Sequence, residues 1–180
     1  SISLSTAAAL VSFQSASFSA ESIIKGSSLS EKFEVEIDES IIKSISDDPF
    51  QQSVSEVDLE SAELIVSVGR GIEREENTSI AFELAESLGA EVSASRPVVD
   101  AGWLPSSRQV GSSGSTVSPK LYFSLGVSGA IQHVVGMKGS NNILAINKDP
   151  DAPIFEIADY AVVGDLLEII PKLIEKLKAS

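Results

Sequence analysis

The stretch that decides the fold is "AELIVSVGRGIEREENTSIAFELAESLGAEVSAS", residues 62–95. Its first seven residues form a short apolar, β-branched run, which is typical of a strand buried on both faces of a parallel sheet. A helix is predicted next: it begins at Asn77 or Thr78, carries isoleucine or leucine at every fourth position, and ends at Gly89. The last six residues predict a second strand. The stretch therefore predicts a strand–helix–strand unit.

The rest of the chain repeats this alternation. Further strands are predicted at 121–127, 142–148 and 160–164, with a short helix at 129–137 and a final helix after Asp165. Strands that alternate with helices imply an α/β fold with a doubly wound parallel sheet. In such sheets, ligands bind outside the carboxyl ends of the strands.

The first third of the chain differs in character. Strand-like runs occur at 7–13 and 32–38, and residues 46–58 resemble a linker. We therefore expect residues 1–58 to be a short β-rich remnant of a preceding domain with its linker, and residues 59–180 to form the main domain.

Composition excludes several classes of protein. The 180 residues suit one domain, or one domain and a piece of another, and no apolar run approaches the roughly 20 residues that span a bilayer. Without cysteine there are no disulfides or thiolate metal sites, and with His133 alone there is no multi-histidine site. No basic residue precedes Lys25, unlike in Arg-rich transit peptides, and the chain begins with Ser. We expect a processed or truncated product.

The net charge of −13 argues against a nucleic-acid partner, because phosphate binding needs a concentrated positive surface. Residues 92–148 differ in charge from the rest of the chain. They carry five basic residues and the single acid Asp100, a net charge of about +4. They are also rich in Ser, Gly, Asn and Gln, which donate hydrogen bonds. This segment is either a sparsely charged part of the core with solvated lysines or a pocket for an anionic ligand.

Polar residues follow nearly every predicted strand, and the carboxyl ends of parallel strands meet at one edge. The long loop 97–120 adds the polar segment "QVGSSGST". The Ser128-Gly129 turn before a helix directs N–H groups to one point and suits a pyrophosphate, although the chain has neither G-x-G-x-x-G nor a Walker A motif. The residues at the strand ends are Arg70, Ser95, Arg96, Ser128, Gly129, Asn147 and Asp165.

Three segments resemble a known family: "SRPVVDAGW" (95–103), "RQVGSSGSTVSPKLYFSLGVSGAIQHVVGM" (108–137) and "ILAINKDPDAPIFEIADYAVVGDLLEIIP" (143–171). They are similar to the FAD-binding domain of the electron transfer flavoprotein alpha subunit, and the resemblance is continuous from about Glu63 to the C-terminus. It implies a Rossmann-like FAD-binding domain with FAD as the cofactor. Residues 1–58 fit, more loosely, the end of that subunit's N-terminal domain and its linker.

The resemblance also implies partners. It predicts an electron carrier without substrate chemistry of its own, which forms a heterodimer with an electron transfer flavoprotein beta subunit. Electrons would pass between dehydrogenases and a quinone reductase or another acceptor. The expected location is the cytoplasm, or the mitochondrial matrix in a eukaryote, with no segment that spans a membrane.

The family's motifs assign roles to individual residues. Arg70 would lie near the phosphates or adenosine, Arg96 beside the isoalloxazine ring, and residues 128–133 along the pyrophosphate, with His133 at the pyrimidine end of the flavin. Asn147 and the Asp165-Leu166 pair would hold the adenosine. The cofactor-binding residues predicted in this way are Arg70, Ser95, Arg96, Gln109, Val110, Gly111, Ser112, Ser113, Ser128, Gly129, Ala130, Ile131, Gln132, His133, Asn147, Asp165 and Leu166.

The loop at 110–113 departs from the family's Val-Gly-Gln-Thr pattern. Ser112 stands where glutamine is usual, Ser113 where threonine is usual, and Ser115 where lysine is common. Ser113 keeps the hydroxyl expected to reach flavin N5. It lacks the methyl group that restricts χ1 in threonine, so we expect its orientation to be less fixed.

A cation such as Arg96 and a donor such as His133 would favour negative charge on a reduced flavin. Simpler roles compete with these. A lone histidine on a helix is often structural. Asp165 and Glu168 have the spacing of a capping box, so Asp165 is expected both to cap a helix and to contact ribose. Trp103 is expected to serve in packing.

Two other classes remain open on the sequence. The chain could be a non-redox module that binds an adenine nucleotide on a related fold, or a structural fragment that no longer binds a cofactor. A yellow chromophore would separate the flavoprotein from both.

Overall fold

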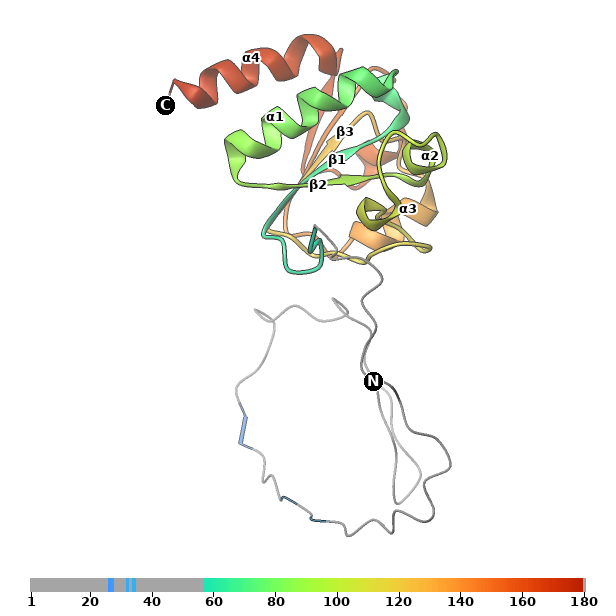
Figure 1. Ribbon diagram of the computed structural model, residues 1–180, viewed down its shortest axis with the longest axis vertical. Helices are drawn as coiled ribbons and strands as arrows, with labels where there is room; N and C mark the ends of the chain where they lie inside the picture. The colour runs from blue at the N-terminus through green and yellow to red at the C-terminus, as the bar shows by residue number, and fades with distance from the viewer. Residues whose placement is uncertain (1–25, 28–31, 33, 35–56, 180) are drawn as a thin grey trace.

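The sheet at the centre of the protein has five parallel strands. In the computed structural model, which describes residues 26–27, 32, 34 and 57–179, the strands follow the order β2-β1-β3-β4-β5. Figure 1 shows the sheet between two layers of helix and loop. The strands are β1 (Leu64–Val68), β2 (Glu91–Ala94), β3 (Leu121–Leu125), β4 (Ile143–Asn147) and β5 (Tyr160–Val163).

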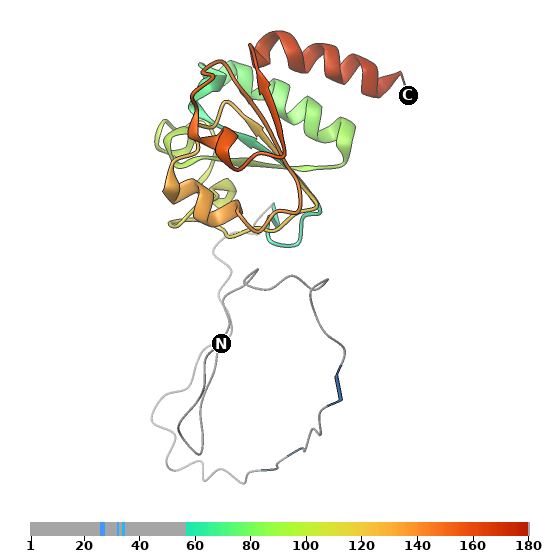
Figure 2. The ribbon, with the colours of Figure 1, turned by 180° about the vertical axis from the view of Figure 1, so that it is seen from behind.

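Helices cover both faces, so the predicted α/β, doubly wound parallel sheet is confirmed. On one face α1 and α4 lie side by side, which both views of the ribbon show (Figures 1 and 2). On the other face, α3 packs through Met137. The helices are α1 (Thr78–Leu88), α2 (Arg96–Asp100), α3 (Ile131–Met137) and α4 (Leu166–Lys178), with 3-10 turns η3 (Arg70–Ile72), η4 (Glu75–Asn77), η5 (Ser106–Arg108) and η6 (Pro153–Glu156).

The five strands and three of the helices occur where the sequence predicts them. The helix expected at 129–137 begins two residues later, because Gly129 and Ala130 are not helical. The interpretation of 97–120 as one long loop was wrong at its start, where α2 forms. The strands predicted at 7–13 and 32–38 lie outside the described residues, apart from positions 32 and 34.

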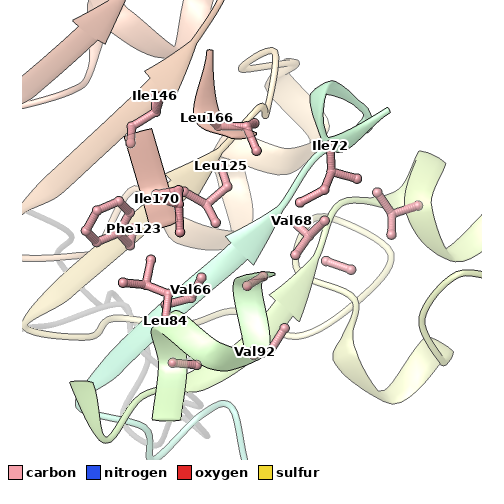
Figure 3. Packing of buried hydrophobic residues seen from close by; sticks show 14 of the residues in the cluster. Val66, Val68, Ile72, Leu84, Val92, Phe123, Leu125, Ile146, Leu166 and Ile170 are labelled. Carbon is pink, nitrogen blue, oxygen red and sulfur yellow. The ribbon is translucent and has the colours of Figure 1, made fainter. Parts of the chain in front are cut away.

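The main core lies between the sheet and the α1–α4 layer. Alternate residues of β1 and β3 point into it, including Val66, Val68 and Leu125, which are fully buried (Figure 3). Leu84 on α1 and Ile170 on α4 cover them. Because an apolar side chain of this size contributes about 1.5–3 kcal/mol when it is fully buried, this layer is the main source of stability.

A second cluster occupies the opposite face, between the sheet, α3 and the segment that precedes β1. Ile65, Tyr122 and Met137 are buried there together with Val57 and Leu59. Val57 lies one residue before the end of the predicted linker, and it packs as part of the domain. The boundary predicted between 58 and 59 otherwise stays a prediction.

We predict that Leu84→Ala lowers the free energy of unfolding by about 2–5 kcal/mol, because it removes buried methyl groups and leaves a cavity between α1 and the sheet. Glu83→Ala, at the neighbouring exposed position, should change it by less than about 0.5 kcal/mol. Urea unfolding followed by circular dichroism measures both. Equal losses in the two variants would show that α1 does not pack as described.

Candidate functional site

A cavity of about 610 Å³ lies at the carboxyl edge of the sheet. This volume is within the range of about 300–1,000 Å³ that is usual for small-molecule sites. The loops after β1, β2, β3 and β4 all contribute to it, as expected for a doubly wound sheet. The lining residues are Arg70, Gly71, Ser95, Arg96, Pro97, Val110, Gly111, Ser113, Gly126, Val127, Ser128, Ala130, Gln132, His133, Asn147, Asp149, Ala152 and Pro153.

Most of the residues predicted from the sequence come together here. Those that line the cavity are Arg70, Ser95, Arg96, Val110, Gly111, Ser113, Ser128, Ala130, Gln132, His133 and Asn147. Six others do not line it: Gln109, Ser112, Gly129, Ile131, Asp165 and Leu166.

The segment after β3 offers a run of unused backbone donors. The N–H groups of residues 128–132 donate no hydrogen bond to any residue within the described part of the chain. Gly129 makes this conformation possible, since its φ is 89° and a Cβ there would lie 2.2 Å from the backbone nitrogen of Ile154. The Ile154 N–H donates to the Ser128 carbonyl at 3.0 Å, which fixes the turn from the opposite side. Consecutive free N–H groups form a binding site suited to a phosphate or another anion.

His133 lies at the other end of this segment and is 6% exposed. Its Nε2 atom lies 2.9 Å from the hydroxyl of Tyr122, whereas its buried Nδ1 has no hydrogen-bond partner among the described residues. Burial lowers the pKa of His133 from 6.5 to about 4, an effect that the Val110 carbonyl partly opposes. The imidazole is therefore neutral at physiological pH, and its Nδ1 makes no full hydrogen bond within the described residues.

The loop after η5 is fixed by hydrogen bonds to α3 and within itself. The Ser112 N–H donates to the carbonyl of Gln132 at 2.7 Å, and the Ser112 side chain is exposed. Gln109 donates from Nε2 to both the carbonyl (3.0 Å) and the hydroxyl oxygen (2.9 Å) of Ser113. Gln109 thus holds the Ser113 oxygen and leaves its O–H free to donate, and the expectation that Ser113 is less fixed than a threonine stays a prediction.

Two arginines stand at the rim of the cavity. The guanidinium of Arg70 lies 5.5 Å from the ring centroid of Trp103, and no carboxylate among the described residues pairs with it. Arg96 lies 3.3 Å from Asp100, one turn along α2, with both side chains mostly exposed. Trp103 also packs against the main core, which confirms its predicted packing role. Both cations are placed to attract an anionic ligand.

The polar side chains after β4 and β5 make two separate sets of contacts. Asn147 donates to the Val127 carbonyl at 3.0 Å and so ties β4 to the segment that follows β3. Asp165 accepts the N–H of Leu167 at 2.8 Å and lies 3.1 Å from Lys148, and these contacts lower its pKa. Lys148 also pairs with Glu73, so its own pKa is raised.

Asp165 therefore caps α4, as predicted. Within the described residues, the Glu168 side chain makes no reciprocal bond to the Asp165 N–H, so the capping box is not completed. The Asp165 oxygens are already engaged with Leu167 and Lys148, and any ribose contact would add to these bonds.

Seven lining residues were missed by the sequence reasoning: Gly71, Pro97, Gly126, Val127, Asp149, Ala152 and Pro153. Most of them offer backbone or small apolar surface, and side-chain chemistry gives no sign of such positions. A signal did exist for the last three, because they lie inside the "INKDPDAPIF" segment that carries the family resemblance.

The described residues contain neither a cluster suited to a metal ion nor a helix suited to cross a membrane. No group of three or more His, Asp or Glu side chains is placed to hold a metal ion within residues 57–179 and the four described positions before them. No helix there is both long and apolar enough to cross a membrane.

Comparison with known proteins gives a consistent result. Residues 58–138 match the family model described as the electron transfer flavoprotein FAD-binding domain. The electron transfer flavoprotein subunit alpha of Thermoanaerobacterium thermosaccharolyticum is 52% identical over 147 residues, which cover 82% of this chain and 44% of the relative. The chain belongs to the electron transfer flavoprotein alpha-subunit family.

Other relatives agree with this assignment. The electron transfer flavoprotein subunit alpha of Mycobacterium tuberculosis (strain CDC 1551 / Oshkosh) is 57% identical over 116 residues, 64% of this chain and 36% of the relative. The mitochondrial alpha subunit of Arabidopsis thaliana is 49% identical over 140 residues, 78% of this chain and 39% of the relative. The chain thus spans less than half the length of these alpha subunits.

The features of the cavity fit FAD, the group for which the matching domain family is named. FAD contains a pyrophosphate, which the free N–H groups of residues 128–132 suit, and a polar flavin ring, which the unpaired His133 Nδ1 suits. Both features belong to residues that line or adjoin one cavity. FAD, when bound, would supply the redox chemistry.

We predict that the free energy of unfolding of this alpha-subunit domain falls by about 2 kcal/mol between pH 7 and pH 5 because of His133 alone. Over this range the unfolded chain binds a proton near pH 6.5, whereas the folded chain takes it up only near pH 4. Urea unfolding at both pH values measures the effect. His133→Gln, which keeps the carboxylates, should remove that part of the pH dependence; equal slopes in the two proteins would contradict the burial of a neutral imidazole.

Proposed function

We propose that this chain is an electron carrier subunit that binds one FAD in the cavity at the carboxyl edge of the sheet and has no substrate chemistry of its own. The observation that carries the proposal is the run of free N–H groups at residues 128–132. This run ends at the buried His133, whose Nε2 is hydrogen-bonded and whose Nδ1 makes no full hydrogen bond in the described residues. An apolar ligand would leave these donors unsatisfied, at a cost of about 1–3 kcal/mol for each group that it buries.

The roles of individual residues follow the same geometry. We infer that residues 128–132 hold the pyrophosphate and that Arg70, which has no carboxylate partner in the described structure, adds charge to that end. His133 and Arg96 would face the pyrimidine side of the flavin ring. Ser113 would donate its free O–H to the ring.

The adenosine side is inferred from the remaining predicted residues. Asn147 lines the cavity, and Asp165 and Leu166 lie next to it at the start of α4. Gln109 and Ser112 would act through the loop that they hold, because their side chains do not line the cavity. Gly129 and Ile131 would contribute through their backbone.

The partners belong to the same proposal. Relatives named as alpha subunits support pairing with an electron transfer flavoprotein beta subunit, and dehydrogenases and a quinone reductase or other acceptor would exchange electrons with the pair. Nothing in the charge pattern favours a nucleic acid, since the net charge is −13. A cytoplasmic location is proposed for a bacterial source. For a eukaryotic source we propose the mitochondrial matrix, because the Arabidopsis thaliana relative is named as mitochondrial.

We predict that the purified chain, loaded with FAD and desalted, stays yellow, and that Ala130→Pro weakens binding by about 10- to 150-fold. The residue has a φ of −55°, which proline adopts, so the substitution removes one N–H donor with little backbone strain. A hydrogen bond to a charged group is worth about 1.5–3 kcal/mol. Quenching of FAD fluorescence in a titration measures the change.

Ala130→Ser is the matched control, because it keeps the N–H and should bind FAD as the parent does. Gly129 is unsuitable for this test, since any side chain there would collide with the Ile154 backbone. If the proline variant binds FAD as tightly as the serine variant, the phosphates do not lie on these donors. A parent protein that binds ADP but not FAD would favour the non-redox nucleotide module instead.

We also predict that Ser113→Ala retains FAD but changes its one-electron potential by about 20–60 mV. One net hydrogen bond of about 0.5–1.5 kcal/mol corresponds to a shift of this size. Spectroelectrochemistry measures the potential. Ser112→Ala, whose side chain lies outside the cavity lining, serves as the control and should leave the potential unchanged. Identical potentials in both variants would mean that Ser113 does not contact the ring.

A further inference from the structure

We propose that Tyr122 is a positioning residue that donates its hydroxyl hydrogen to Nε2 of His133, so that the single ring proton of the imidazole sits on Nδ1. Tyr122 lies on β3, beneath the site, and does not line the cavity. The inference about the tautomer concerns this chain alone, and its consequence for FAD rests on the function proposed above.

A row of small side chains makes room for Tyr122. Ser93, Ser67 and Ser124 are direct neighbours in the registers of β2, β1 and β3, and all three are fully buried. Tyr122 precedes Ser124 by two residues, so both side chains point to the same face of the sheet. The hydroxyls of Ser67 and Ser93 act on the Tyr122 hydroxyl, although neither meets the geometry of a full hydrogen bond. A larger residue at these positions would fill the space that the phenol occupies.

The phenol reaches His133 from this position. The hydroxyl oxygen lies 2.9 Å from Nε2, and the two rings meet edge to face with centroids 6.1 Å apart. Both side chains are buried, at 0% and 6% exposure. The contact is thus a buried hydrogen bond between two neutral groups, closed to water on the Tyr122 side.

The positions of the protons follow from burial. Desolvation raises the pKa of Tyr122 to about 12 and lowers the pKa of His133 to about 4, so at pH 7 the phenol keeps its proton and the ring carries only one. An imidazole nitrogen without a proton is a stronger acceptor than a serine hydroxyl. The Tyr122 proton therefore goes to Nε2, and the ring proton stays on Nδ1.

A proton on Nδ1 bears on the one ring nitrogen of His133 that makes no full hydrogen bond among the described residues. Nδ1 is buried and makes no full hydrogen bond among the described residues, although the Val110 carbonyl acts on the ring, and an N–H in that position is costly unless an acceptor completes its hydrogen bond. With the other tautomer, Nδ1 would be an acceptor, and a carbonyl oxygen of the ligand would be repelled. Tyr122 thereby selects a ligand with an acceptor at this end of the cavity.

The single histidine allows a direct test in the protein without cofactor. In protein labelled with ¹⁵N-histidine, every ring resonance belongs to His133. We expect protonated Nδ1 and unprotonated Nε2 at pH 7. Tyr122→Phe should move the population toward the Nε2–H form, which free imidazoles prefer. A parent protein with its proton on Nε2 overturns the inference.

Ser124→Ala is the matched control, because it changes a buried hydroxyl on the same strand and face without touching His133. It should leave the tautomer unchanged, and an equal change in this variant would point to a general effect of cavity formation. Should Tyr122→Phe fail to fold by circular dichroism, the parent's spectrum still decides which nitrogen carries the proton.

The consequence for FAD is measured separately. Addition of FAD should shift the Nδ1–H resonance of the parent, and Tyr122→Phe should raise the Kd for FAD by about 2- to 12-fold, the change expected for one net hydrogen bond. Unchanged affinity in a variant whose tautomer has moved would overturn the ligand-selecting role. If the parent binds no FAD, the proposed function fails while the tautomer result stands by itself.

Discussion

The contact between the backbones of Gly129 and Ile154 is the constraint on which the site depends. Without a side chain at Gly129, the segment after β3 lies against the loop after β4, and the Ile154 N–H donates to the Ser128 carbonyl. The N–H groups of residues 128–132 around this turn donate to no acceptor within the described residues. The cavity, the start of α3 and the position of His133 all follow from that turn.

The sheet contributes to the site in a different way, through the two faces of its central strands. The face toward α1 and α4 is filled with apolar side chains, whereas the face toward α3 combines apolar residues such as Ile65 with buried serines. The hydroxyls of Ser67, Ser93 and Ser124 are buried there and make no full hydrogen bond within the described residues. Such groups cost free energy, which the apolar packing on the two faces of the sheet offsets.

Much of the fold could be predicted because its signals are local. Apolar runs fixed the strands, and Gly89 and Asp165 marked the end of α1 and the start of α4. Tertiary contacts decide the rest. The short helix α2 was missed in a segment taken for a loop, and the Gln109 bond to Ser113 depends on a loop geometry that no pattern reveals. Pro171 lies within α4 although proline disfavours a helix interior, because the buried face of α4 outweighs the lost bond.

The contact between Arg70 and Trp103 gives the protein an optical reporter. Trp103 is the only tryptophan in the chain, and the cation above it belongs to the rim of the cavity. An anion that draws the guanidinium away from the indole changes the electric field at the ring and therefore its emission. Occupancy of the phosphate end can thus be followed by intrinsic fluorescence, with ligands that have no colour of their own.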